Sequence, residues 1–206
     1  MKNVLLIGDS IRMGYDKAVK KSLEGKAEVF FPQENCRFAA FVLRNLHEYK
    51  TLLPEGKADV VHWNAGLWDC LRLFGEEPQT PIDIYAYYIE RICVRIKKVY
   101  PDARVIFATS TAIWPEKMRL RRNEEIEQYN QVASDIARKH GFEVNDLYAV
   151  STTLPEEAHS DGTHYYTPQG TEAFTNAVLS HLLPALDINE EIVYKEELHT
   201  DKPIGF

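Results

Sequence analysis

Short runs of apolar residues alternate along the chain with longer stretches in which apolar residues recur every three or four positions. The apolar runs predict five buried strands, at residues 4–7, 27–31, 59–63, 104–108 and 142–147. The longer stretches predict helices at residues 10–23, 38–49, 81–99, 120–140 and 168–183. Gly141 ends the fourth of these helices, and Pro168 stands in the first turn of the last, where proline is favoured.

Strands that alternate with helices predict right-handed crossovers and a mainly parallel sheet covered on both faces. We therefore expect an α/β protein with a three-layer α/β/α, flavodoxin-like fold around a five-stranded, mainly parallel sheet. We expect this domain to span residues 1–186, with residues 187–206 as a charged C-terminal tail. The tail contains Ile192, Val193 and Tyr194, so it can pack on the body of the protein or on a neighbouring subunit of a homo-oligomer.

Composition and charge narrow the class of partner. The 206 residues are 45% hydrophobic and 27% charged, which is typical of a soluble globular domain. The formal net charge of -7 disfavours a nucleic-acid partner, because phosphate binding favours a basic face. One basic run, at residues 117–122, is followed by three glutamates, and we interpret it as the solvated start of a helix, with a phosphate-binding patch as the alternative.

Cysteine usage and hydropathy bear on the compartment. Cys36, Cys70 and Cys93 are too few and too scattered for a disulfide framework, which fits a reducing compartment. No metal-ligand spacing occurs among Cys and His, and we expect neither a metal nor another cofactor. No stretch approaches the roughly 18 apolar residues of a membrane span, so we expect no membrane partner. We expect a cytoplasmic location, with a cleaved export signal absent from this sequence as the alternative.

Ser10 stands at the carboxyl end of the first predicted strand, where open α/β sheets bind their ligands. It follows Gly8 and Asp9 and begins a helix, so the positive end of the helix dipole lies beside its hydroxyl. That position suits the binding of an oxyanion. The alternative is that Asp9 or Ser10 only caps the helix.

His164 has the best context among the seven histidines for a base that activates a serine. Serine is a weak nucleophile until a base takes its proton, and Asp161 precedes His164 by three residues in a turn that contains Gly162. The carboxylate can fold back on the imidazole, fix its tautomer and stabilise the imidazolium. The alternative is a surface turn near a helix start.

Taken together, these segments resemble the sequence blocks of the SGNH, or GDSL-type, hydrolase family over residues 3–185. The matching segments are Gly8-Asp9-Ser10, Gly66-Leu67-Trp68-Asp69 and Asp161-x-x-His164. The resemblance implies a flavodoxin-like fold and metal-free hydrolysis of esters and thioesters. It also implies that Ser10 is the nucleophile, His164 the base and Asp161 the partner of that base.

Two departures from the family pattern concern the oxyanion hole. The second block usually has a glycine whose backbone N–H binds the oxyanion, and here it reads Asn35-Cys36-Arg37. A backbone donor needs no particular side chain, so we expect this loop to donate N–H groups. The third block usually has an asparagine where this chain has Trp68, whose indole is a poor substitute.

We favour Asn64 as the replacement amide, because it leaves the third strand beside Gly66, where the chain turns sharply. Asn35 is the second candidate, although shaping its own turn is the more common role for such a residue. Arg37 could meet an anionic or hydroxyl-rich substrate. Asp69 we interpret as a structural hydrogen-bond acceptor, and His62 as a core residue.

Aromatic residues near the strand ends could stack on sugar rings, although packing is the more common role for such side chains. They are Trp63, Trp68, Trp114 and Tyr165.

We therefore expect a serine esterase acting on short-chain acyl esters, including O-acetylated carbohydrates, with a small-molecule or saccharide ester as its substrate. One alternative is a catalytically weakened family member that only binds a carbohydrate or acyl ligand. Another is a nucleotide or phosphate binder, although the first strand-to-helix turn lacks a glycine-rich loop.

Overall fold

The computed structural model describes residues 1–200, so the last six residues of the expected tail lie outside the described part. Its five strands form one sheet in the order β2-β1-β3-β4-β5, and every pairing is parallel. The strands are β1 (Lys2–Ile7), β2 (Ala27–Phe30), β3 (Val60–Trp63), β4 (Arg104–Ala108) and β5 (Glu143–Asn145). The predicted α/β, flavodoxin-like class is confirmed.

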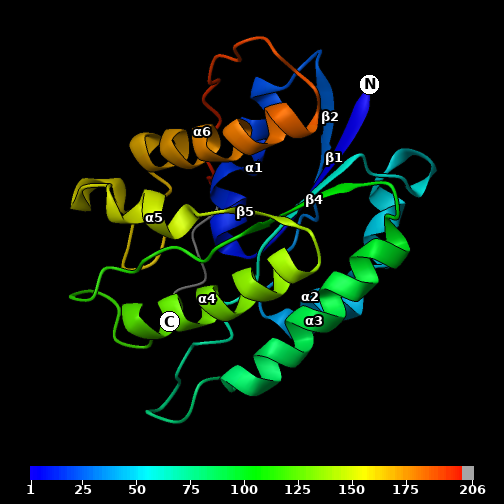
Figure 1. Ribbon diagram of the computed structural model, residues 1–206. Helices are drawn as coiled ribbons and strands as arrows, with labels where there is room; N and C mark the ends of the chain where they lie inside the picture. Colours follow the sequence, from blue (N-terminus) through cyan, green and yellow to red (C-terminus); the bar gives the residue numbers. More distant parts are fainter. Residues whose placement is uncertain (201–206) are drawn as a thin grey trace.

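Helices cover both faces of the sheet (Figure 1). On one face α1 (Ser10–Ser22) packs against α6 (Pro168–Ala185), and the short α5 (Leu147–Thr152) also contacts α6. On the other face α3 (Ile82–Val99) lies between α2 (Ala39–Asn45) and α4 (Asn123–Lys139). Three short 3-10 helices, Glu48–Leu52, Pro54–Gly56 and Glu156–Ala158, lie in the connections.

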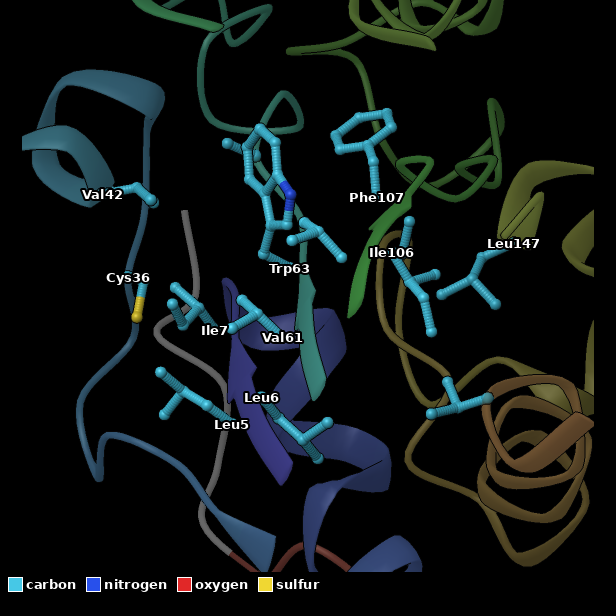
Figure 2. Close-up of a cluster of buried hydrophobic side chains, with 14 of the residues drawn as sticks. Leu5, Leu6, Ile7, Cys36, Val42, Val61, Trp63, Ile106, Phe107 and Leu147 are labelled. Atoms are coloured by element: carbon cyan, nitrogen blue, oxygen red, sulfur yellow. The ribbon is translucent and has the colours of Figure 1, made fainter. Parts of the chain in front are cut away.

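The core lies on both faces of the sheet, which explains why the central strands β1, β3 and β4 have largely apolar sequences. Trp63 of β3 and Phe107 of β4 are register partners with ring centroids 5.0 Å apart, and Figure 2 shows them side by side. The neighbouring residue Ile106 points away from them, toward Leu147 at the start of α5 (Figure 2). All four side chains are buried.

Three predicted elements differ from those observed. The helix expected at residues 38–49 ends at Asn45 and continues as a 3-10 helix. The strand expected at residues 142–147 is only three residues long, because the Asp146 side chain accepts the N–H of Ala149 and so begins α5.

The third difference concerns the basic run at residues 117–122. Residues 117–122 form a loop, not the solvated start of a helix, and α4 begins at Asn123. The backbone N–H of Arg72 donates to the Leu120 carbonyl at 2.8 Å and ties this loop to the body. Arg121 is consequently buried, whereas Arg119 and Arg122 are exposed.

The described part of the tail, residues 187–200, packs on the body of the same chain. The Lys195 N–H donates to Ser22 Oγ at 2.9 Å, and Lys21 Nζ donates to the Glu197 carboxylate at 2.9 Å. Ile192 packs against the core, and the His199 ring lies 4.7 Å from that of Tyr166. Subunit association through the tail stays a prediction.

Two further expectations concern membranes and thiols. Over residues 1–200, no helix combines the length and the apolar character needed to cross a bilayer. Cys36, Cys70 and Cys93 are all buried free thiols.

Candidate active site

Ser10 is the first residue of α1, and the residue before it supplies the helix cap. The Asp9 side chain accepts the N–H of Ile11 at 2.9 Å. Burial raises the pKa of the Asp9 carboxyl. Because Asp9 does the capping, the Ser10 hydroxyl is free for another partner, and the first N–H groups of the helix have no partner within it.

That partner is His164, which approaches Ser10 from the loop before α6. His164 Nε2 lies 2.8 Å from Ser10 Oγ, and His164 Nδ1 lies 2.8 Å from Asp161 Oδ2 and 3.0 Å from Asp161 Oδ1. Ser10 and His164 are each 8% exposed, so the hydroxyl and the imidazole meet in a largely dry environment. The three predicted residues are therefore brought together in one hydrogen-bonded chain.

A tight turn holds the carboxylate on the imidazole. Asp161 Oδ1 accepts the backbone N–H groups of Thr163 at 2.7 Å and His164 at 2.8 Å. Gly162 packs directly on the backbone of Lys117, where a Cβ atom would stand 2.9 Å from the carbonyl. The glycine in this turn is thus required by a close approach of two loops.

These contacts determine the charge state of the carboxylate. Partial burial raises the pKa of Asp161, but the hydrogen bond and charge of His164 and the two backbone N–H groups outweigh burial and lower it to about 2. Asp161 is therefore ionised throughout the neutral and mildly acidic range, as a group that orients an imidazole and stabilises its charged form must be.

Tyr166 joins the two halves of this arrangement. Its hydroxyl donates to the Ser10 carbonyl at 2.6 Å, and its ring lies 5.0 Å from the His164 ring. Gly14, one turn further along α1, leaves room for the Tyr166 ring, since a Cβ there would come within 2.8 Å of it. Tyr166 thus fixes the position of α1 relative to the loop before α6, residues 159–167, which is called the histidine loop below.

A pocket of about 180 Å³ opens beside Ser10. Five segments line it: the start of α1, the loops after β2 and β3, the loop before α4, and the histidine loop. The lining residues are Ser10, Asn35, Trp68, Lys117, Met118, Arg121, Asp161, Gly162, Thr163 and His164.

Asn35 and Trp68, two of the residues expected to bind the oxyanion or the substrate, line this pocket. The backbone donors expected beside Asn35 are engaged elsewhere. The Cys36 N–H donates to the Gly8 carbonyl at 3.1 Å, and the Arg37 N–H donates to Asn35 Oδ1 at 2.8 Å. Arg37 adopts a left-handed φ of 48° at this turn.

Asn64 and Gly66 lie outside the pocket lining. Asn64 is 2% exposed and lies beside the Asp9 carboxyl, with its Oδ1 packed against Gly8 and lacking a hydrogen-bond partner. Gly66 has a φ of 147° and packs under Ser110 and Tyr85. The position that the sequence favoured for the amide donor is therefore set back from the cavity.

The other candidates are structural in this fold. Asp69 accepts the N–H of Ala39 with both carboxylate oxygens, at 3.2 and 3.0 Å, as expected of a structural acceptor. His62 is fully buried in the core, and burial lowers its pKa to about 3.

Four aromatic residues were candidates for stacking on a sugar ring. In the described structure only one of them, Trp68, lines the pocket beside Ser10. Trp63 packs on Phe107, and the Tyr165 hydroxyl donates to a backbone carbonyl. The Trp114 ring lies against that of His159, tilted, with the centroids 5.8 Å apart.

Sequence reasoning missed the contribution of the loop before α4. Lys117, Met118 and Arg121 all line the pocket, although they belong to the run that we interpreted as a solvated helix start. A basic run beside a predicted strand end was the only available signal, and the pattern alone does not say which of its cations turns inward.

Comparison with known proteins gives the class of the fold, which is like that of the SGNH hydrolases. No family model matches the sequence, and no curated protein matches it. Solved structures do match in fold.

A lipase/acylhydrolase from Enterococcus faecalis superposes with a TM-score of 0.73 at 19% identity, over 96% of this chain and 100% of the other. The acetyl xylan esterase AlAXEase gives 0.71 at 16% identity, over 87% and 99%. An acetylxylan esterase from Geobacillus stearothermophilus gives 0.67 at 18% identity, over 95% and 97%.

Proposed function

We propose that this protein is a serine esterase that hydrolyses short-chain acyl esters through an acyl-enzyme intermediate. The single observation that carries the proposal is the hydrogen-bonded chain from Ser10 through His164 to Asp161, placed at the mouth of a pocket. Structural similarity to acylhydrolases and acetyl xylan esterases supports the same class of reaction.

The cycle has two acyl-transfer steps. His164 Nε2 takes the proton of Ser10 as Oγ attacks the ester carbonyl, and Asp161 stabilises the imidazolium that forms. His164 then returns the proton to the leaving alcohol as the tetrahedral intermediate collapses. Water, activated by the same imidazole, attacks the acyl-serine and releases the acid.

The oxyanion needs preorganised N–H donors in a site largely closed to water. The backbone N–H of Ser10, at the positive end of α1, is one such group. Because Asn64 is set back from the cavity, we assign the side-chain donor to Asn35. Its Oδ1 is held by the Arg37 N–H, which leaves the amide nitrogen as the donor on a residue that lines the pocket.

The size of the pocket and the half-buried face of Trp68 bear on the substrate. A cavity of about 180 Å³ suits a small acyl group, and an aromatic ring in a pocket can stack on a sugar ring. With acetyl xylan esterases among the similar structures, an O-acetylated carbohydrate is a candidate substrate within the broader class of small-molecule and saccharide esters.

Acyl chain length tests this proposal. We expect kcat/KM for p-nitrophenyl esters to be greatest for acetate or propionate and to fall toward decanoate, because a longer chain exceeds the cavity. Initial rates across the series, at concentrations below micelle formation, measure this. A kcat/KM that rises steadily from acetate to decanoate would contradict the assignment to short-chain esters.

The pH dependence of the rate tests the role of His164. An imidazole acts as a base only when it is neutral. We therefore expect kcat/KM to rise with pH through the mildly acidic range and to level off above it. Because the pKa of Asp161 is about 2, no second acidic limb is expected above pH 4. A flat profile over this range, with chemistry rate-limiting, would argue against His164 as the base.

A further inference from the structure

Arg121 is a buried cation without an ion-pair partner in the described structure. Its exposed fraction is 5%, and its Nε donates to the Leu67 carbonyl at 2.5 Å. Its Nη1 contacts the thioether of Met118 at 3.9 Å. Among residues 1–200, no carboxylate forms an ion pair with this guanidinium, although the charges of Asp9 and Asp161 act on it from further away.

Arg12, the other deeply buried arginine, shows how this fold treats a structural guanidinium. It is 1% exposed, forms an ion pair with Asp16, and donates to the carbonyls of Gly8 at 3.3 Å and Glu34 at 2.8 Å. Burying an unpaired charge is costly. The contrast indicates that the free N–H groups of Arg121 serve a partner that residues 1–200 do not supply.

Arg121 lines the same cavity as Ser10, so a ligand bound in that cavity could contact its guanidinium. Lys117 lines that cavity as well, with its Nζ held 3.7 Å above the Trp114 ring. Two cations and one ionised carboxylate, that of Asp161, therefore line a small pocket, which leaves its lining net positive in a chain whose formal net charge is -7. Such local reversal of sign attracts an anionic ligand into the site.

We propose that Arg121 binds a carboxylate carried by the ester substrate, so that the enzyme selects anionic esters over neutral ones. The inference rests on the proposed esterase function and names the substrate class of that site. A guanidinium fixed through Nε presents its Nη edge as a rigid fork, which matches the two oxygens of a carboxylate.

Two matched ester pairs test the proposal and locate the carboxylate. Mono-4-nitrophenyl glutarate and its methyl ester differ by one charge on the acyl side. The compounds 4-acetoxybenzoate and methyl 4-acetoxybenzoate differ by one charge on the alcohol side. For wild-type protein we expect kcat/KM to be at least about tenfold higher for the anionic member of one pair, since a hydrogen bond to a charged group contributes about 1.5–3 kcal/mol. The pair that responds identifies which side carries the carboxylate.

Variants of the loop before α4 connect that preference to Arg121. Arg121→Met should lower the anionic-to-neutral ratio roughly tenfold to hundredfold, and Arg121→Lys, which keeps the charge but loses the fork, should lower it less. Arg119→Met is the matched control, because Arg119 is exposed on the same loop, and its ratio should equal that of wild type. If Arg121→Met does not fold by circular dichroism, Arg121→Lys decides.

The outcomes separate this proposal from the esterase function. Equal kcat/KM within both pairs for wild type would overturn the anion preference and leave the esterase intact. An Arg121 variant that loses the same factor in kcat/KM on anionic and neutral esters would also overturn the anion preference.

If none of the four esters is hydrolysed, the esterase proposal fails, and calorimetry decides whether Arg121 binds a carboxylate. Wild type should then bind glutarate and not glutaramide, with glutarate binding weakened at least about tenfold in Arg121→Lys and retained in Arg119→Met. Equal binding by wild type and Arg121→Lys would overturn it.

Discussion

Replacing Ser10 with alanine should lower kcat for p-nitrophenyl acetate by at least about a thousandfold, because removal of a triad member leaves only binding and oxyanion stabilisation. The protein should keep its fold, since Asp9 supplies the cap of α1 and the Ser10 hydroxyl contributes no bond to the helix. Steady-state rates with purified protein, together with a thermal unfolding curve, measure both expectations.

Ser180→Ala is the matched control. Ser180 is exposed on α6, far from the pocket lining, and its hydroxyl bonds only the Ala177 carbonyl of the same helix in the described structure. This variant should be as active as wild type. A folded Ser10→Ala protein that retains most of the activity would remove the basis of the proposed mechanism. A wild type as inert as Ser10→Ala would favour the family member that only binds its ligand.

Replacing Asn35 should cost about 10²–10³ in kcat with little change in KM, because an oxyanion donor acts mainly in the transition state. Two variants separate the donor from the turn. Asn35→Ala removes the donor and also the acceptor of the Arg37 N–H. Asn35→Asp keeps an acceptor for that N–H and removes only the amide donor, so it should be at least as impaired as Asn35→Ala.

Asn64→Ala provides the comparison for this prediction. Asn64 is buried behind Gly8 and Asp9, so its replacement should lower stability more than it lowers kcat. Kinetics at a temperature well below each unfolding midpoint distinguish the two effects. If Asn64→Ala loses kcat while Asn35→Asp keeps it, the donor is Asn64, as the sequence first suggested.

Much of the sheet was predictable because its three central strands are buried on both faces. Val61, Ile106 and their neighbours give short apolar runs, which are typical of a covered parallel sheet. Element ends were less predictable, because they depend on single contacts. The Asp146 side chain, which accepts the Ala149 N–H, turns the end of the last strand into a helix, and no periodicity records such a bond.

The candidate site also contains residues that the sequence identified and residues that it did not. Ser10, Asp161 and His164 were identifiable because their chemistry needs particular residue types at particular places along the chain. The pocket wall was not, because Arg121 faces inward through a loop conformation held by the Leu67 and Leu120 carbonyls. In the same way, the choice between Asn64 and Asn35 depends on depth below the surface, which sequence spacing does not encode.

The hydrogen bond between Ser10 and His164 joins positions 154 residues apart. It forms only when α6 docks on α1, and a contact of such long range is among the slow ones to close as a chain folds. Recovery of turnover after dilution from denaturant is therefore a measure of the final docking event. Partly ordered chains with an intact sheet and a detached last helix would have regular secondary structure by circular dichroism and yet be inert.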